Sequence, residues 1–484
     1  MTRTTYNDLH DNLAMSDLLS TLLVAASNSL EVKHGRVIVL DEPVLRAKGI
    51  DALAHLAVFG DDARRANARW LIWETAQTLG VRPSSIHELY VARGEGKLPH
   101  TFTTPAMNIR MLTYDLCRAA FSAAIAGNVG AMIFELARSE SSYTDQRPAE
   151  YVAVVLAAAI KEGFRGPLFI QGDHYQVNAR KYNSEKDRAG EIDALKALMS
   201  EAVAAGYYNI DIDTSTLVDL SKNSLLEQQR LNYELCAMFS DYIRERQPAG
   251  VTISLGGEIG EVGHKNSDIH ELKAFMDGYL PLVKHRPGIS KISVQTGTSH
   301  GGTVLPDGSI ADVAIDFNVL KEISAASYAY GMGGAVQHGA STVPATAYGK
   351  FVQSGAIEVH LATAFQTNTF DVLPKVINDE VNTWLFKNAI EERKSTDTDE
   401  QFLYKTRKKA IGPFKNAMWN LPESERARVR ETLYKRFELY FNRLGVENTV
   451  DLVARTVHTV AIHRTPEDFG AAPLPAEDVE GLAD

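Results

Sequence analysis

The sequence predicts a (β/α)8 TIM barrel with added helical segments at both termini, and three observations support this fold class. Short β-rich runs recur eight times between about residues 100 and 375, and segments with helical spacing of apolar residues separate them. This alternation is typical of a barrel of parallel strands surrounded by helices. The 484 residues are 45% apolar, which is enough for one large core. An open doubly wound sheet shows the same alternation and is the main competing arrangement.

The eight expected strands are short and end in polar or small residues. In chain order they are "PAMNIR" (105–110), "AMIFEL" (131–136), "PLFIQGDH" (167–174), "YNIDIDTS" (208–215), "TISLGGEIG" (252–260), "KISVQTG" (291–297), "GAVQHGAS" (334–341) and "AIEVHLAT" (356–363). After the fourth run, Ser224 and Glu227 have the spacing of a capping box. Apolar residues at helical spacing then predict a helix, and they are Leu231, Leu235, Met238, Phe239 and Tyr242.

Helices are also expected on both sides of the barrel. Near the N-terminus, "DDARRANARWLIWETAQTLG" begins with a capping Asp, stops at Gly80 and places three residues on one side, Trp70, Trp73 and Ala76. Near the C-terminus, Pro422 opens a helix that Gly445 closes. Its apolar stripe consists of Val429, Leu433, Phe437, Tyr440 and Leu444.

These signals divide the chain into four parts. They are an N-terminal helical extension (1–100), the catalytic barrel (101–375), a C-terminal helical extension (376–470) and a flexible acidic tail (471–484). We expect the extensions to cover the barrel or to form an oligomer interface, rather than to carry a separate activity.

Composition and charge exclude several classes of protein. Lys and Arg number 50 against 61 Asp and Glu, and the net charge of −11 argues against nucleic acid or a membrane as partner. Only Cys117 and Cys236 are present, too few for a disulfide framework or a thiolate metal site. The sequence shows neither a signal peptide nor an apolar run of about 18 residues that could span a membrane. We expect a cytoplasmic protein that forms a homodimer or homotetramer.

Chemistry in such a barrel takes place at the C-terminal ends of the strands, where the loops converge. Three of these ends carry a histidine, His174, His300 and His338. Carboxylates also lie at these ends, namely Asp173, Asp211, Asp213 and Glu258. Three imidazoles on one rim fit a divalent metal site of the open, catalytic kind, with room for a substrate oxygen. Each histidine taken singly is more often a hydrogen-bonded structural residue, so the prediction depends on their coincidence.

Small residues follow the same strand ends. Gly301 and Gly302 follow His300, "GAS" (339–341) follows His338, and Thr363 ends the eighth strand. Turns with exposed backbone N–H groups, aided by hydroxyl side chains, can hold a phosphate. Barrel enzymes often bind phosphate in the loops after their last strands. Simple turn chemistry is the alternative interpretation of these residues.

Six motifs in this region follow one another on the expected strands: "TTPAMNIRML", "GDH", "IDIDTSTLVDLSKNSLLEQ", "GGEIG", "GTSHGG" and "QHGAST". In this order they resemble motifs of the class II, metal-dependent aldolases that act on fructose and tagatose bisphosphates. The resemblance covers about residues 103–370. It implies a metal-dependent aldolase that cleaves or forms a carbon–carbon bond of a ketose phosphate or bisphosphate. The products would be dihydroxyacetone phosphate and an aldehyde.

The resemblance also implies roles for single residues. His174, His300 and His338 match the zinc ligands of the family. Glu258 matches a carboxylate that can hold the metal in a more buried position, with Asp213 nearby. Asp173 matches the acid/base that handles the proton of the C4 hydroxyl.

The substrate-binding positions carry over in the same way. Asn108 matches a residue of the first strand that contacts the substrate. The positions that hold the phosphate correspond to Gly301, Gly339, Ser341 and Thr363, often with a monovalent cation alongside. In this family Zn²⁺ or another divalent ion acts as a Lewis acid on a metal-stabilised enediolate. Neutral histidine ligands would keep such an ion strongly electrophilic.

Several positions depart from the family pattern. Gln171 replaces a histidine, and Gly256 replaces a glutamate. In the loop after the fifth strand, the family's catalytic Glu is replaced by Lys265 and Asn266. Glu261 or His264 could take over its proton-exchange role.

The remaining departures concern the aldehyde half of the substrate. Glu135 replaces a glutamine, and the serine that normally follows it is missing, so that Arg138 is the candidate replacement. His360 replaces an asparagine and puts a different polar group beside the substrate. Val304 replaces a lysine. The substrate is therefore not restricted to fructose 1,6-bisphosphate.

Two other functions remain open. The chain could be a catalytically altered aldolase-like subunit that acts as a binding or scaffold partner, which the altered loop at Lys265 and Asn266 favours. A metal-dependent hydrolase on the same fold is the third hypothesis, and fold-level analogy does not separate it from the first.

Overall fold

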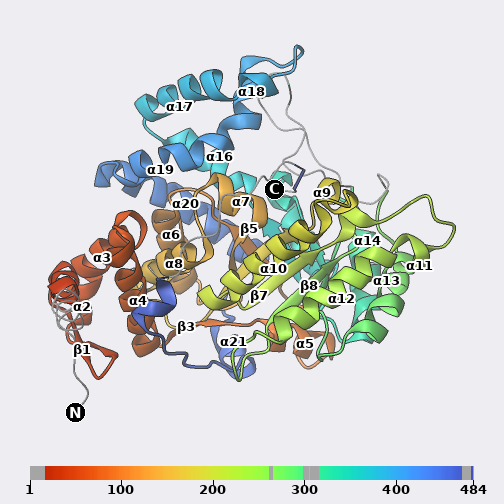
Figure 1. Ribbon diagram of the computed structural model, residues 1–484, viewed down its shortest axis with the longest axis horizontal. Coiled ribbons are helices and arrows are strands. Elements are labelled where there is room, and N and C mark those ends of the chain that lie inside the picture. Colours follow the sequence, from red (N-terminus) through yellow and green to blue (C-terminus); the bar gives the residue numbers. More distant parts are fainter. Residues whose placement is uncertain (1–16, 261–264, 298–304, 306–314, 471–480, 483–484) are drawn as a thin grey trace.

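The computed structural model describes residues 17–260, 265–297, 305, 315–470 and 481–482. Eight parallel strands form its centre, and helices surround them (Figure 1). The strands are β4 (Thr104–Asn108), β5 (Ile133–Ala137), β6 (Gly166–Gln176), β7 (Asn209–Asp213), β8 (Ser254–Glu258), β9 (Lys291–Val294), β10 (Ala335–Gln337) and β11 (Glu358–Leu361). All eight expected runs are therefore confirmed as strands.

The sheet closes on itself. Each strand from β4 to β11 pairs in parallel with the next, and β11 pairs with β4, for example through Val359 and Pro105. Closure confirms the (β/α)8 barrel and excludes the open doubly wound sheet. A ninth strand, β3 (Val81–Ser84), pairs with the N-terminal part of β6 outside the ring. The sequence pattern did not predict β3, because four residues that include Pro83 give no clear strand signal.

The N-terminal extension contains the expected long helix. Helix α4 (Asp62–Leu79) is capped by Asp61, whose carboxylate accepts a hydrogen bond from the backbone of Arg64, and ends at Gly80 with φ 74°. The extension also holds a hairpin of β1 (Leu30–Lys33) and β2 (Arg36–Val39), which the sequence pattern did not predict.

The C-terminal segment around residues 462–464 packs against α4. The indole nitrogens of Trp70 and Trp73 donate to the carbonyls of Arg464 and Ile462 at 2.9 and 2.7 Å. The expected apolar face of α4 is therefore buried against the far end of the chain, because an indole N–H in a buried position needs an acceptor.

The C-terminal extension packs on the barrel at two places. Helix α20 (Glu423–Arg443) packs along α6 (Thr113–Ala126), which follows β4. The short helix η7 (Arg407–Ala410) contacts α7 (Arg138–Tyr143), which begins where β5 ends. In Figure 1 the helices α17 (Lys375–Asn388), α18 (Asp399–Thr406) and α19 (Ile411–Trp419) lie above this end of the barrel. The extension therefore sits beside the C-terminal ends of β4 and β5.

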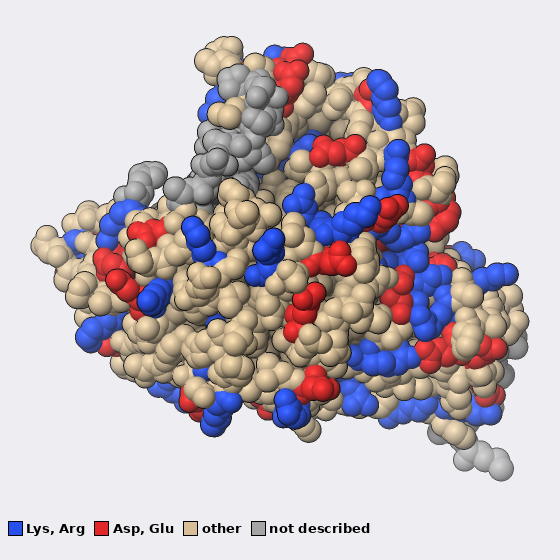
Figure 2. All heavy atoms as spheres, turned by 180° about the vertical axis from the view of Figure 1, so that it is seen from behind, with Lys and Arg blue, Asp and Glu red and all other residues tan. Residues whose placement is uncertain are grey.

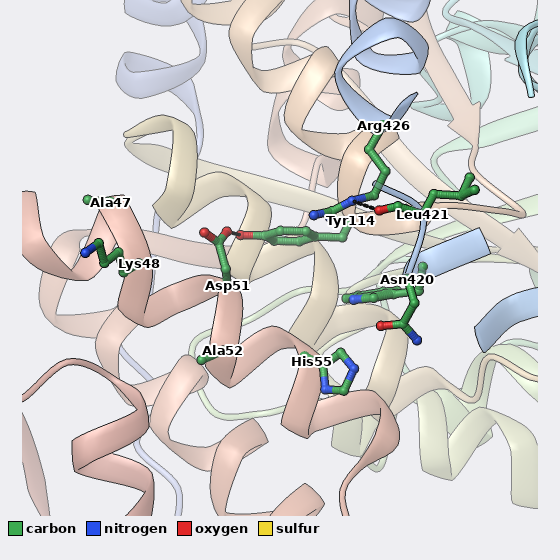
Figure 3. Close-up of a pocket in the computed structure, with 10 residues that line it drawn as sticks. Ala47, Lys48, Asp51, Ala52, His55, Tyr114, Asn420, Leu421 and Arg426 are labelled. Carbon is green, nitrogen blue, oxygen red and sulfur yellow. Dashed lines mark hydrogen bonds between the residues drawn. The ribbon is translucent and has the colours of Figure 1, made fainter. Parts of the chain in front are cut away.

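A cavity of about 490 Å³ lies where the two extensions meet the barrel (Figure 3). The ring of Tyr114 stacks on Trp419 with centroids 5.7 Å apart, and its hydroxyl donates to Asp51 at 2.6 Å. The carboxylate of Asp51 also pairs with Lys161 at 2.6 Å. Residues of α3 (Ile50–Phe59), α6 and the C-terminal extension therefore line this cavity together.

Figure 2 shows basic and acidic side chains interspersed over the face seen from behind. Among the described residues, none of the helices combines the length and the apolar character needed to cross a membrane.

Candidate metal centre

A bulge at the end of β6 presents two neighbouring side chains to the site. The register between β6 and β7 shifts between Gly172 and Tyr175, and His174 has φ 40°. A bulge re-aims side chains that a regular strand would point to opposite faces, and here both Asp173 and His174 are buried and contact the same cluster. Gly172 is required, because a Cβ at this position would lie 2.5 Å from the ring of Tyr175.

His174, Glu258 and His338 converge at the ends of β6, β8 and β10. One possible ligand atom from each lies within 4.8 Å of the others, and all three side chains are buried. His174 Nδ1 is 3.4 Å from Glu258 Oε2, and His338 Nδ1 is 3.9 Å from Glu258 Oε1. A tetrahedral zinc ion with bonds of about 2.0–2.1 Å places its ligand atoms about 3.3 Å apart. The donor types and their spacing therefore fit such an ion after small side-chain adjustments. We call these three residues the outer group.

Asp213 orients His174. Its Oδ2 lies 3.1 Å from His174 Nδ1, and the carboxylate also accepts hydrogen bonds from Gln176 and Ser215. Carboxylates beside metal-binding histidines hold the ring in place and increase its basicity. Because Asp213 and Glu258 both face Nδ1, Asp213 orients the ring if Nε2 binds the metal and is a further ligand if Nδ1 does.

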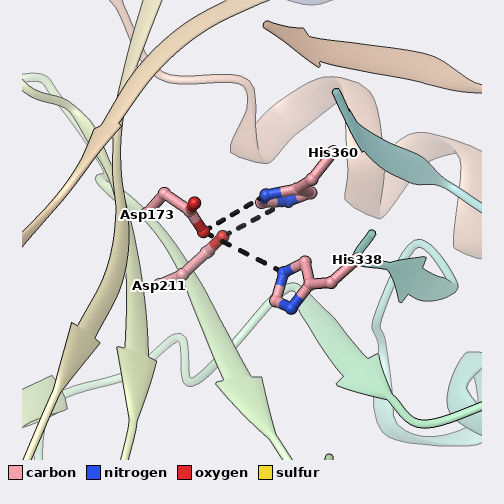
Figure 4. A group of neighbouring side chains, drawn as sticks. All are labelled: Asp173, Asp211, His338 and His360. Atoms are coloured by element: carbon pink, nitrogen blue, oxygen red, sulfur yellow. Dashed lines mark ion pairs between the residues drawn. The ribbon is translucent and has the colours of Figure 1, made fainter. Parts of the chain in front are cut away.

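A second cluster lies further inside the barrel (Figure 4). Its four residues also offer ligand atoms within 4.8 Å of one another and are all buried, and they are Asp173, Asp211, His338 and His360. His360 Nδ1 is 3.2 Å from Asp173 Oδ1, and His360 Nε2 is 3.7 Å from Asp211 Oδ2. We call these residues the inner group. The two groups share His338.

Below the inner group the barrel interior is charged rather than aliphatic. Lys291 Nζ contacts Glu358 at 2.5 Å, Asp211 at 2.9 Å and Gln171 at 2.7 Å, and its side chain is fully buried. Glu358 also accepts hydrogen bonds from Tyr90 and His360. Most barrels fill this space with branched apolar side chains. The polar interior thus extends from the metal centre into the core.

Glu135 completes this interior network. It accepts a hydrogen bond from Gln171 Nε2 at 2.9 Å, and its Oε1 lies 3.2 Å from His360 Nδ1. Burial and the charge of Asp173 raise the pKa of Glu135 to about 7, despite the opposing effect of His360. Burial also raises the pKa of Asp211 to about 6, although Lys291 opposes it.

The charges of the site separate its acids from its bases. Burial raises the pKa of Asp173, but His174 and His360 outweigh it and hold the pKa well below its usual range. Burial lowers the pKa of His174, but Asp173 and Glu258 outweigh it and raise the pKa well above its usual range. Asp173 is therefore an ionised carboxylate at neutral pH.

The other predicted substrate residues lie around this rim. Asn108 is buried and donates to Glu140 at 2.6 Å. Arg138 is also buried, and it forms a two-bond ion pair with Glu191 and donates to the carbonyl of Gln176. The roles of Asn108 and Arg138 in substrate binding stay predictions.

The loops after β10 and β11 meet where phosphate binding is predicted. The backbone N–H of Ala362 donates to Ser341 Oγ at 2.7 Å, and Gly339 has φ 69°. Thr363 is the first residue of α16 (Thr363–Val372), whose N-terminus faces this junction. A helix N-terminus favours negative charge, so this arrangement is compatible with phosphate binding.

Four of the predicted site residues lie outside the described residues. They are His300, Gly301, Glu261 and His264. Their predicted roles stay predictions.

Sequence reasoning did not assign a role to the charged interior. Lys291, Glu358 and Glu135 lie on the barrel strands and face inward, and Asp211 lies on β7 beside them. A lysine at the start of a strand usually reaches the solvent, so nothing in "KISV" indicates a buried ammonium group. The signal available was the number of ionisable residues inside runs that were expected to be buried.

Comparisons with known proteins agree with this arrangement. A family model described as fructose-bisphosphate aldolase class-II matches residues 99–422. No curated protein sequence matches the chain. The YdjI aldolase from Escherichia coli K12 is 13% identical with a TM-score of 0.46, and the match covers 76% of this chain and 99% of that one. A fructose-bisphosphate aldolase from Campylobacter jejuni is 15% identical with a TM-score of 0.43, over 76% and 96% of the two chains.

A fructuronate-tagaturonate epimerase, UxaE from Cohnella laeviribosi, is 12% identical with a TM-score of 0.52. The match covers 72% of this chain and 82% of that one. At this identity the likeness shows a shared fold and does not extend to the reaction.

Proposed function

The chain belongs to the class II fructose-bisphosphate aldolase family, and from this premise we propose that it is a metal-dependent aldolase. It would cleave or form a carbon–carbon bond of a ketose phosphate or bisphosphate, with dihydroxyacetone phosphate and an aldehyde as products. The observation that supports this proposal best is the outer group, His174, Glu258 and His338, with the ionised Asp173 beside it.

The outer group would hold the divalent ion, for which Zn²⁺ is the proposed identity. When bound, such an ion is a Lewis acid that stabilises negative charge on substrate oxygens. Asp173 would take the proton of the C4 hydroxyl. As the C3–C4 bond breaks, the C4 oxygen becomes the aldehyde carbonyl, and the electron pair remains with the dihydroxyacetone phosphate half until C3 takes up a proton.

The loops after β10 and β11 would hold the phosphate of that half. Ser341 and Thr363 supply hydroxyl groups, and the N-terminus of α16 supplies backbone N–H groups. Binding energy from a non-reacting phosphate can position the reacting carbon atoms close to Asp173.

The test is a cleavage assay of purified protein reconstituted with Zn²⁺, on a panel of ketose 1-phosphates and 1,6-bisphosphates. Formation of dihydroxyacetone phosphate is followed with a coupled NADH-consuming reductase. We expect at least one substrate to be cleaved, and the activity to disappear with a chelator. Asp173→Asn should lower kcat by about 10²–10⁴-fold without loss of the outer metal ion.

Asp277→Asn is the matched control, because this carboxylate lies on α13 (Ile269–Leu282) at the surface and pairs only with Lys273 in the described contacts. It should leave cleavage unchanged. Full activity of Asp173→Asn, or cleavage that survives complete chelation, would contradict the proposal.

An aldolase-like binding subunit is the second candidate. Lys265 favours it, because it occupies the loop where the family carries a catalytic Glu and its ammonium group pairs with Glu271 at 2.9 Å. Metal binding without cleavage of any ketose phosphate in the panel would favour this candidate over the first.

A further inference from the structure

We propose that the chain binds a second divalent metal ion inside the barrel, at the inner group of Asp173, Asp211, His338 and His360. The proposal concerns metal binding alone, so it does not depend on the aldolase activity. Three ligands lie on strands, β6, β7 and β11, and His338 follows directly after β10, so the site is built on the barrel rather than on long loops.

Two acceptor atoms of this group face each other. His360 Nε2 lies 2.7 Å from Glu358 Oε1 and donates to it, so Nδ1 is the ring nitrogen that faces the other carboxylates. This Nδ1 is 3.2 Å from Asp173 Oδ1. Both atoms are buried, and neither has a hydrogen-bond partner among the described residues. In the absence of metal a proton on the ring can occupy the space between them, and a metal ion that binds both atoms would take its place. Ligand atoms of Asp211 and His338 lie within 4.8 Å of both, so the four together fit a metal ion.

The charges inside the barrel around the inner group also favour a bound cation. The buried ionisable groups there include one lysine, the imidazole of His360 and four carboxylates, Asp173, Asp211, Glu135 and Glu358. An uncompensated buried charge costs several kcal/mol. In the described contacts Lys291 pairs with Asp211 and Glu358 and not with Asp173. A divalent ion at the inner group would supply positive charge beside Asp173 in place of the ring protons of the neighbouring histidines.

His338 is placed to serve both groups. Its Nδ1 is 3.9 Å from Glu258 in the outer group, and its Nε2 is 4.0 Å from Asp173 in the inner group. The same Nε2 also lies 3.5 Å from Ser293 Oγ, a long contact that a metal bond would replace. Two ions would therefore share the imidazole of His338, one on each nitrogen. The ring would release its remaining N–H proton to solvent when the second ion binds.

Asp173 can hold the inner ion and still face a substrate. Its contacts with His174, His338 and His360 all involve Oδ1, and Oδ2 is the oxygen left for the C4 proton. Room for the neighbouring carboxylate comes from Gly256, because a Cβ there would lie 2.3 Å from Asp211 Oδ1.

The test measures zinc bound per chain. Full-length protein is dialysed with excess Zn²⁺, freed of loose metal by gel filtration and analysed for zinc by mass spectrometry, while zinc-edge anomalous diffraction locates the ions. We expect two zinc ions per chain, with the second peak between Asp173 and His360. Asp211→Asn should bind one ion, at the outer group. Glu258→Gln should also bind one ion, at the inner group.

Glu358→Gln is the matched control, because it removes the same charge from the same network but not a ligand, and it should keep both ions. Gly256→Ala displaces Asp211 without removing it and should bind one ion, which keeps the test valid if Asp211→Asn does not fold. One zinc ion per wild-type chain, a second peak elsewhere, or equal zinc loss in Glu358→Gln and Asp211→Asn would overturn the proposal. One ion at the outer group would leave the proposed aldolase function intact, whereas no ion at all would overturn both.

Discussion

The buried ammonium group of Lys291 is the main compensating charge of the barrel interior, and Lys291→Met removes it at nearly constant volume. Methionine follows the same path as the lysine stem, so the packing of the aliphatic part is largely kept. The variant leaves Glu358 and Asp211 without the contacts at 2.5 and 2.9 Å that they make in the wild type. It also leaves the side-chain oxygen of Gln171 without its donor.

The expected loss of stability follows from this burial. Removing one partner of a buried ion pair costs about 3–5 kcal/mol, because the remaining charge stays in a poorly solvated place. Burial alone would raise the pKa of Glu358, but Lys291 outweighs it and lowers the pKa from 4.5 to about 2. A depressed carboxyl pKa contributes stability above its unfolded value, and this contribution is lost as the pH falls from 4.5 towards 2. The difference between wild type and variant should therefore be largest at neutral pH and shrink as the pH falls.

The assay is urea unfolding of chelator-treated protein, followed by tryptophan fluorescence at neutral pH and again at pH values below 4.5, where the contribution of Glu358 is lost. Lys273→Met is the matched control, because Lys273 pairs with Asp277 at 2.5 Å on the surface. Exposed pairs contribute only about 0–1 kcal/mol. The reasoning is wrong if Lys291→Met destabilises the chain no more than Lys273→Met does, or if its deficit grows as the pH falls.

Three further predictions concern the metal centre and the bulge that supports it. Zinc affinity, measured with a competing chelator, should fall by about tenfold for each pH unit below neutrality and for each proton that competes with the metal. The reason is that Asp173 and Glu258 raise the pKa of His174, and a protonated ring cannot bind metal. An affinity independent of pH would contradict this prediction. Asp213→Asn should weaken zinc binding by about 10–100-fold in the same assay, and unchanged affinity would show that Asp213 neither orients His174 nor binds the metal. Gly172→Ala should lower the free energy of unfolding by about 1–3 kcal/mol, because its Cβ would lie 2.5 Å from the buried ring of Tyr175. The control is Gly190→Ala on helix α10 (Arg188–Ala205), where an added Cβ meets nothing within 4 Å, and it should not destabilise the chain.

The barrel itself could be predicted from sequence because its signals are local. Each strand is a short apolar run between turn residues, and eight such runs separated by helices leave few alternative folds. The expected helix after β7 shows the limit of this approach. Ser224 accepts a hydrogen bond from the backbone of Glu227 as predicted, but the helix is interrupted at Gln229 and continues as α12 (Arg230–Arg244). The predicted stripe is only half-buried apart from Phe239, because a barrel helix packs against neighbouring helices as well as against the strands.

The outer group could be predicted for a different reason. His174, Glu258 and His338 each lie near the C-terminal end of a parallel strand, and closure of the barrel brings such ends together wherever they stand in the sequence. The inner group could not be predicted in this way. Whether Asp211 or Lys291 faces the interior depends on the tilt and register of the closed sheet, and a shift of one residue would turn either side chain outward.

Four of the departures from the family motifs meet at one place in the structure. Glu135, Gln171 and His360 form one network, with Gln171 Nε2 2.9 Å from Glu135 Oε2 and His360 Nδ1 3.2 Å from Glu135 Oε1. Gly256 adjoins it, because any larger residue there would collide with Asp211. A carboxylate buried at one of these positions needs a proton, a cation or a donor at the next, so a change at one position favours changes at the others.

This coupling explains why the differences should be considered together rather than as separate losses. Glu135→Gln alone would remove the carboxylate that faces His360, while His360→Asn alone would leave Glu135 without its imidazole neighbour. Residues in one charged network show interaction energies of about 0.5–3 kcal/mol in double-mutant cycles. The double variant should therefore be more stable than the sum of the two single changes predicts. Urea unfolding of the four proteins measures this difference, and strict additivity would mean that the two side chains do not depend on each other.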